Sequence, residues 1–164
     1  MVPREQKPNA PNTKRNWFYF LNFEEAAMTI FKTRGFDSLI AKGLTVRGEL
    51  LLEVNSTLII EGAVFASAVR VANPESVKSN KTTLRVTGEL GQMGDKLLDI
   101  EIQNVIITGK VECNELRVEG TLAVKSGASL VANKILYREL VVETGAIMNG
   151  AMYHLDHVSE GEKT

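Results

Sequence analysis

The stretch that decides the fold is residues 104–152, NVIITGKVECNELRVEGTLAVKSGASLVANKILYRELVVETGAIMNGAM. It consists of short apolar runs separated by glycine, and apolar residues alternate with polar ones, as at Val105, Ile107 and Val111. Alternation with a period of two indicates β-strands, because successive side chains of a strand point to opposite faces. The stretch therefore predicts short strands joined at glycine-containing corners.

The same unit recurs from Ser38 onward. One glycine marks each unit, at Gly43, Gly62, Gly88, Gly109, Gly127 and Gly145. The spacings are 19, 26, 21, 18 and 18 residues, and the two widest contain a polar loop at 73–81 and a glycine-bracketed turn at 91–96. A repeat of about 18 residues fits three strands of about five residues each, stacked coil upon coil. We therefore predict an all-β fold, a parallel β-helix of about six coils.

The rest of the chain differs in composition. Residues 1–16 contain three prolines among polar residues and are predicted to be a disordered arm. Seven of the ten aromatic residues lie before residue 37, which makes 17–36 an aromatic amphipathic segment. We expect a short helix there, although its first residues would also suit a short strand. The β-helix domain is expected to span 37–156, followed by a polar tail at 157–164.

Composition argues against several functional classes. The net charge of -1 lacks the positive field of a general nucleic-acid binder, so no nucleic acid is expected as a partner. Cys113 is the single cysteine, which excludes an intramolecular disulfide, and the N-terminus lacks the apolar run of a secretory signal. No stretch is long and apolar enough to span a bilayer. A cytoplasmic protein is the simplest expectation.

No residue pattern indicates catalysis, a cofactor or a metal. His154 and His157 beside Asp156 are an incomplete metal site, and we expect a solvated tail there. Cys113 has no histidine nearby in the sequence and is expected to be a buried small residue. Gly91 and Gly94 lack the lysine pattern of a phosphate-binding loop. An acyltransferase with a hexapeptide-repeat helix would need a strict period of six and a histidine within the coils, and we expect no enzyme.

The region from Ser38 to Leu155 resembles the bactofilins, bacterial polymer-forming cytoskeletal proteins. The resemblance is most specific in STLIIEGAVFASAVRVAN and in the ending LVVETGAIMNGAM. It implies a right-handed, triangular β-helix that assembles end to end into non-polar filaments without nucleotide. It also implies a role in cell shape, disordered flanking tails and, in many members, an N-terminal tail that attaches the filament to the membrane.

The chain departs from the bactofilin pattern at a few positions. Met148 stands where the family often has phenylalanine, and Cys113 and Ala132 occupy corners where glycine is common. Residues 74–81 insert a loop into one coil, and the aromatic segment 17–36 is longer than the tail of most relatives.

The resemblance and the β-helix geometry together predict that the chain's main partner is itself. The two open ends of a solenoid expose unpaired backbone groups and apolar side chains. The predicted self-assembly residues are Leu39, Ile40, Leu44 and Val46 at one end and Ile147, Met148, Met152 and Leu155 at the other.

The N-terminal segment has two main interpretations. Residues 1–35 carry a local charge of +3 beside Trp17, Phe18, Phe20, Leu21 and Phe23, which suits a peripheral anchor on an anionic membrane. The same side chains could instead cap or buttress the solenoid, or dock a partner protein. The cap would make the chain a non-polymerising adaptor that binds a partner protein through a lateral face or the loop at 74–81, which is the alternative functional hypothesis.

Overall fold

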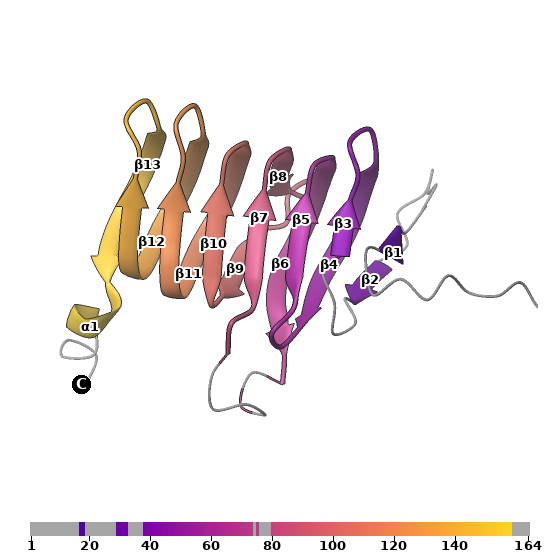
Figure 1. Ribbon diagram of the computed structural model, residues 1–164, viewed down its shortest axis with the longest axis horizontal. Coiled ribbons are helices and arrows are strands. Elements are labelled where there is room, and N and C mark those ends of the chain that lie inside the picture. Colours follow the sequence, from indigo (N-terminus) through magenta and orange to yellow (C-terminus); the bar gives the residue numbers. More distant parts are fainter. Residues whose placement is uncertain (1–16, 19–28, 33–37, 74, 76–79, 159–164) are drawn as a thin grey trace, which may run out of the picture.

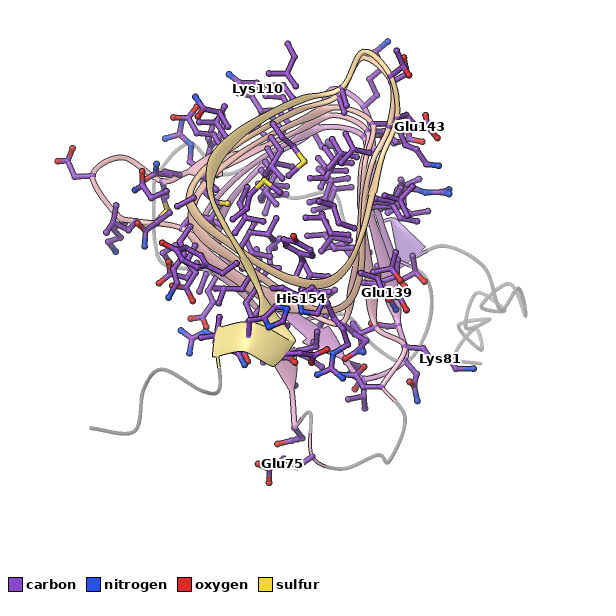
Figure 2. All side chains as sticks on the ribbon, turned by 90° about the vertical axis from the view of Figure 1, so that its left-hand side faces the viewer. Glu75, Lys81, Lys110, Glu139, Glu143 and His154 are labelled. Carbon is purple, nitrogen blue, oxygen red and sulfur yellow. The ribbon has the colours of Figure 1, made fainter. Side chains whose placement is uncertain are left out.

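The computed structural model describes residues 17–18, 29–32, 38–73, 75 and 80–158. These residues form thirteen strands, joined in one continuous sheet by parallel pairings between successive coils. The sheet winds into a β-solenoid of about six turns, seen from the side in Figure 1 and as a triangle along its axis in Figure 2. The predicted fold class is confirmed.

The strands line three sides of the triangle, which we call the first, second and third faces. The first face holds β3 (Ser38–Ile40), β5 (Thr57–Ile60), β7 (Thr83–Val86) and β10 (Asn104–Ile107). The second and third faces share the longer strands β4 (Thr45–Glu53), β6 (Ala63–Ala72), β11 (Lys110–Val124), β12 (Ser129–Val142) and β13 (Ile147–His154). β8 (Glu89–Gln92) lies on the second face and β9 (Asp99–Ile102) on the third. The ends of β11 and β12 turn back onto the first face.

The alternation in the sequence places columns of aliphatic residues on the inner side of the faces. On the first face Leu58, Leu84, Val105 and Leu122 are in register, and none is more than 1% exposed. Each fully buried aliphatic side chain contributes roughly 1.5–3 kcal/mol. A coil on its own would expose these side chains, so the stacking of coils supplies the burial that stabilises each of them.

The corners between the first and second faces require glycine. Gly88 donates its N–H to the carbonyl of Ile60 at 2.9 Å, and Gly109 donates to the carbonyl of Val86 at 3.0 Å. A Cβ atom at Gly88 would overlap the carbonyl oxygen of Gly62, and one at Gly109 would overlap that of Gly88. At Gly88 and Gly109 the glycine thus reflects the close approach of the backbones of neighbouring coils, whereas Gly43 and Gly127 have room for a Cβ atom but adopt a positive φ, of 86° and 77°.

Both predicted insertions are present. The one between β6 and β7 returns to the solenoid at Thr82, whose N–H donates to Asn80 Oδ1 at 2.9 Å, while Asn55 Oδ1 accepts from the N–H of Lys81 at 2.8 Å. Residues 74 and 76–79 lie outside the described residues. The other insertion is a turn between β8 and β9, in which Gly94 has a φ of 60°.

The expected helix at 17–36 is wrong where the structure describes this segment. β1 (Trp17–Phe18) pairs with β3, and β2 (Thr29–Lys32) pairs with β4. The first coil offers unpaired N–H and C=O groups along its edge, which an extended segment satisfies, whereas a single short helix is only marginally stable in water. The rest of 17–36, the arm at 1–16 and residues 159–164 lie outside the described residues.

The solenoid strands end at His154, and the short helix α1 (Leu155–Val158) follows. The predicted end of the β-helix domain at 156 therefore falls inside α1. The beginning of the predicted polar tail at 157–164 is helical as far as Val158.

The corner geometry predicts that Gly88→Ala lowers the free energy of unfolding by about 1–3 kcal/mol, because the added methyl group overpacks against a carbonyl of the next coil. Urea unfolding followed by circular dichroism measures this change. Gly91→Ala is the matched control: its Cβ would lie 3.5 Å from the Phe65 ring, an ordinary contact. Equal stability of the two variants would contradict the stacking argument.

Candidate functional site

The last coil leaves one backbone edge open. Residues 139–142 of β12 pair with β11, and β13 pairs with β12, each on the side of the preceding coil. Among the described strands none pairs with the opposite edge of this coil. A row of N–H and C=O groups is therefore available to another chain.

The solenoid bore is open at the same end. Val142 continues the inward column of Val124, and Met152 continues that of Ile135. Val124 and Ile135 are fully buried, whereas Val142 is 48% exposed and Met152 is 46% exposed. Figure 2 looks onto this end and shows α1 at the margin of the triangle, where it leaves the bore uncovered.

Apolar side chains also point outward from each face of the last coil. Val141, Ile147 and Tyr153 are 47%, 62% and 45% exposed. In earlier coils the column of Ile147 holds Ser129, Lys110 and Glu89, and the last two form an ion pair at 3.6 Å. The change from polar to apolar residues at this position is what a surface that becomes covered requires. We call this end the C-terminal face; it comprises Leu140, Val141, Val142, Ile147, Met148, Met152 and Tyr153.

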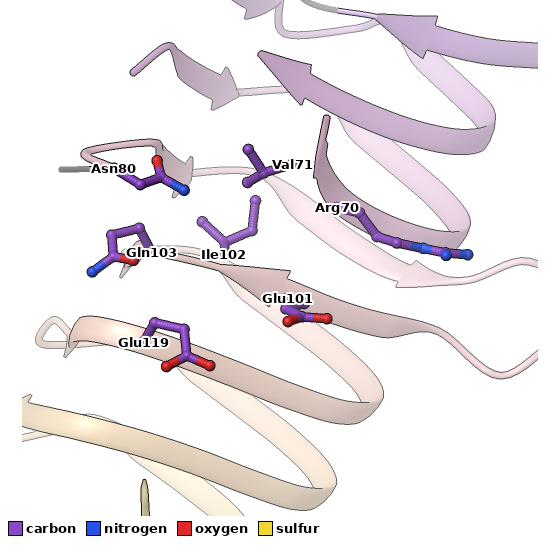
Figure 3. A pocket seen from close by; sticks show the side chains of 7 residues that line it. All are labelled: Arg70, Val71, Asn80, Glu101, Ile102, Gln103 and Glu119. Carbon is purple, nitrogen blue, oxygen red and sulfur yellow. The ribbon is translucent and has the colours of Figure 1, made fainter. Parts of the chain in front are cut away.

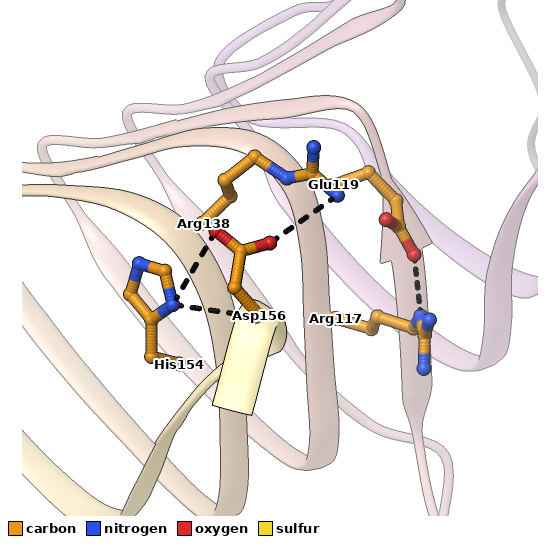
Figure 4. Close-up of polar contacts among 5 residues, drawn as sticks. All are labelled: Arg117, Glu119, Arg138, His154 and Asp156. Carbon is orange, nitrogen blue, oxygen red and sulfur yellow. Dashed lines mark hydrogen bonds and ion pairs between the residues drawn. The ribbon is translucent and has the colours of Figure 1, made fainter. Parts of the chain in front are cut away.

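Polar contacts hold α1 beside the bore. Arg138 lies 3.9 Å from Asp156, and the N–H of Asp156 donates to Nδ1 of His154 at 3.3 Å (Figure 4). The His154 ring packs edge-on against Tyr137, with the centroids 5.6 Å apart. Within the described part of the chain, no group of three or more potential ligands is arranged to hold a metal ion.

The predicted self-assembly residues lie at opposite ends of the rod. Ile147, Met148 and Met152 belong to the C-terminal face, but Leu155 does not contribute to an open surface. It is only 9% exposed, because α1 folds back onto β12 and β13. Leu155 is thus buried within the chain and lies apart from the other residues predicted at this end.

The opposite end of the rod is partly covered. Leu39, Ile40, Leu44 and Val46 all belong to the first coil, where Ile40 is 2% and Val46 is 8% exposed. β1 and β2 pair with this coil on two of its three faces. Trp17 and Phe18 are the strand β1, and Phe20, Leu21 and Phe23 lie outside the described residues. The two ends of the solenoid are therefore not equivalent.

Sequence reasoning missed Leu140, Val141, Val142 and Tyr153. The signal available was the uninterrupted run at 140–142: consecutive aliphatic residues in a strand must point both inward and outward. In this run Leu140 and Val142 point inward and Val141 points outward, and an outward aliphatic residue beside the end of the repeat indicates a covered surface.

Cys113 is buried, as predicted, with 3% of its surface exposed. Burial, followed by the negative charges of Asp99 and Glu112, raises the pKa of its thiol to about 12. Because the thiolate is the nucleophilic form, the protonated Cys113 is unsuited to attack a substrate near neutral pH.

Comparison of the chain with models of known protein families, with curated protein sequences and with solved structures finds no match. The bactofilin resemblance therefore stays a prediction. None of the helices in the described residues has the length and apolar character needed to cross a membrane.

Proposed function

We propose that this chain is a non-enzymatic, bactofilin-like scaffold that self-associates end to end through its C-terminal face into nucleotide-independent assemblies. The observation that carries the proposal is the open last coil, with its exposed apolar side chains and its unpaired strand edge. The proposal assigns the chain no catalytic step and no cofactor.

The contact we propose joins two copies through the same face. A two-fold arrangement places the last coil of one copy against that of the other, which is the commonest symmetry of soluble oligomers. The facing edges can then pair as strands, and Val142 and Met152 close the bore from both sides. Each is about half-exposed, so burying it gains roughly 1 kcal/mol, and the outward Val141, Ile147 and Tyr153 add to this at the rim.

Growth into a filament also needs contacts at the opposite end. There β1 and β2 occupy part of the edge of the first coil. This pairing favours the alternative, an adaptor whose N-terminal segment caps the solenoid and limits assembly to a pair of copies. Under the filament hypothesis, the N-terminal segment must dissociate from that edge, or a second copy must add its strands to β1 and β2.

We further propose that the assembly lies on the cytoplasmic surface of a membrane. Support comes from residues 1–35, whose local charge of +3 accompanies aromatic residues suited to the lipid interface. Tyr19, Phe20 and Phe23 lie outside the described residues, and Glu24 and Glu25 oppose binding to anionic lipid.

Introducing charge into the C-terminal face tests self-association. The variants Val142→Glu and Met152→Glu should reduce the mass of the assembled species, because a carboxylate in a closed bore must be desolvated. Light scattering coupled to gel filtration measures the mass, and negative-stain microscopy detects filaments. Leu97→Glu is the control, since Leu97 is 58% exposed but lies in the turn between β8 and β9. Assemblies unchanged by the first two variants, or a wild-type monomer, would contradict the proposal.

Disrupting β2 separates the filament from the capped adaptor. Adjacent residues of a strand direct their N–H groups to opposite sides, so Ile30→Pro combined with Phe31→Pro removes whichever donor bonds to β4. If the segment caps the rod, this variant should convert a discrete species into longer assemblies seen by negative-stain microscopy. Asn12→Pro, in a stretch that already contains prolines, controls for proline itself. Long filaments formed equally by wild-type and variant protein would reject the cap.

Vesicle co-sedimentation tests the membrane proposal. Full-length protein should sediment with phosphatidylcholine vesicles that contain phosphatidylserine more than with vesicles that lack it, because the basic residues are attracted to anionic headgroups. Phe20→Glu with Phe23→Glu should weaken this binding, while Leu97→Glu on the rod should not. Equal sedimentation of all three proteins would reject the anchor.

A further inference from the structure

The third face of the solenoid is split between two neighbouring coils. β6 and β9 pair only at Ala68 with Asp99 and at Val69 with Ile100. On its other side β6 pairs with β4 as far as Ala72, and β9 pairs with β11 as far as Ile102. The facing edges at 70–72 and 101–102 therefore have no ladder partner across the gap among the described strands. We call this gap the slot.

The insertions explain why the slot is there. One insertion lies directly after β6 and the other directly before β9. The connections from β6 to β7 and from β8 to β9 are therefore longer than the equivalent connections in other coils. The ladder resumes fully between β9 and β11, because β11 belongs to a coil that contains neither insertion. The slot is thus built by the two departures from the 18-residue repeat.

The slot has an apolar floor and polar ends. It is a cleft of about 340 Å³, lined by Arg70, Val71, Asn80, Glu101, Ile102, Gln103 and Glu119. Figure 3 shows Val71 and Ile102 facing each other across the gap, with the amides Asn80 and Gln103 at one end. Ligand sites commonly enclose roughly 300–1,000 Å³, so the slot takes a short segment and not a folded domain.

The charge around the slot is negative. A second cleft adjoins it and shares Arg70 and Glu101. The acidic residues that line the two clefts are Asp99, Glu101, Glu115 and Glu119, against the basic residues Arg70 and Arg117, a net charge of -2.

The two cations that line the clefts, Arg70 in both and Arg117 in the second, already have carboxylate partners. Arg117 Nε donates to Glu119 at 2.6 Å and lies 4.0 Å from Glu101, as Figure 4 shows for the shorter contact. Arg70 pairs with Glu49 at 3.5 Å. An incoming cation is therefore favoured over an incoming anion.

We propose that the slot binds a short extended peptide of a partner protein, with aliphatic side chains on one side and Lys or Arg on the other. Strand addition supplies main-chain hydrogen bonds to the free edges of β6 and β9. Because side chains alternate along a strand, an aliphatic residue reaches Val71 and Ile102 while its neighbours face Glu101 and Glu119. The slot lies on the side of the rod, so the peptide binds without using the C-terminal face.

Titration of full-length protein with dye-labelled peptides tests this assignment. The probe is the pentapeptide Lys-Val-Lys-Val-Lys, blocked at both ends and followed by fluorescence anisotropy. Its Glu-Val-Glu-Val-Glu counterpart tests the charge, and a version methylated on its backbone nitrogens tests strand addition. Both counterparts should bind at least about five-fold more weakly, the effect of one favourable ion pair or hydrogen bond. Equal binding of the three peptides would overturn the proposal.

Charge reversal on the protein locates the binding. Glu101→Lys and Glu119→Lys should each weaken the lysine peptide about five-fold or more, while Glu89→Lys, an exposed residue of the second face, should leave it unchanged. Val71→Trp, which fills the slot, should weaken both the lysine peptide and its backbone-methylated version. Equal effects of Glu101→Lys and Glu89→Lys would reduce the interaction to general attraction of cations and reject the site.

Hydrogen exchange provides an independent readout of the slot. Saturating peptide should slow amide exchange within residues 70–72 and 101–103, because strand addition pairs N–H groups there. Displacement of the peptide by an equal concentration of spermidine would show that charge attraction alone holds it. Unchanged exchange in both segments would show that the peptide does not add a strand. Either result would overturn the proposal.

Discussion

The structure depends on the hydrogen-bonded contact between successive coils. A coil has three short strands and a few inward aliphatic residues, which is too little to form a core alone. Stacking pairs the backbone edges and buries the inward columns at the same time, as in the run from Leu58 to Leu122. Interior coils meet both demands through their two neighbours, except at the slot between β6 and β9, where the ladder stops after Val69 and Ile100. A terminal coil has one neighbour, so one of its backbone edges is left unpaired and its inward side chains are left uncovered on that side.

The two ends of the solenoid differ in how far they are covered. At the first coil, β1 and β2 supply part of a further coil and pair with the available edge on two faces. At the last coil, α1 is held at the side by Arg138 and Asp156 and leaves the bore open. Self-association through the open end and a cap at the other would give a discrete pair; displacement of the cap would permit growth. The slot adds a lateral site that neither outcome blocks.

The repetitive part of the fold could be predicted from the sequence because its determinants are local. Alternation places Val105 and Ile107 inward, and the close approach of coils requires Gly88 and Gly109, so the pattern itself carries the geometry. β1 and β2 could not be predicted this way, because their strand conformation depends on pairing with the edges of β3 and β4 later in the chain. Burial of Leu155 depends in the same way on a four-residue helix folding back. The slot arises where two insertions interrupt the ladder between β6 and β9. Their position next to this one ladder follows from the pairing of strands in three dimensions and is not visible in the sequence.

Under the proposed self-association, the edge of the last coil pairs with a second copy of the chain. Amide hydrogen exchange of residues 139–154, followed as a function of protein concentration, tests it most directly. We expect exchange in this segment to slow as the concentration rises, while exchange in β10, which already has neighbours on both sides, stays constant. Exchange in residues 139–154 that is equally fast at every concentration would contradict the account.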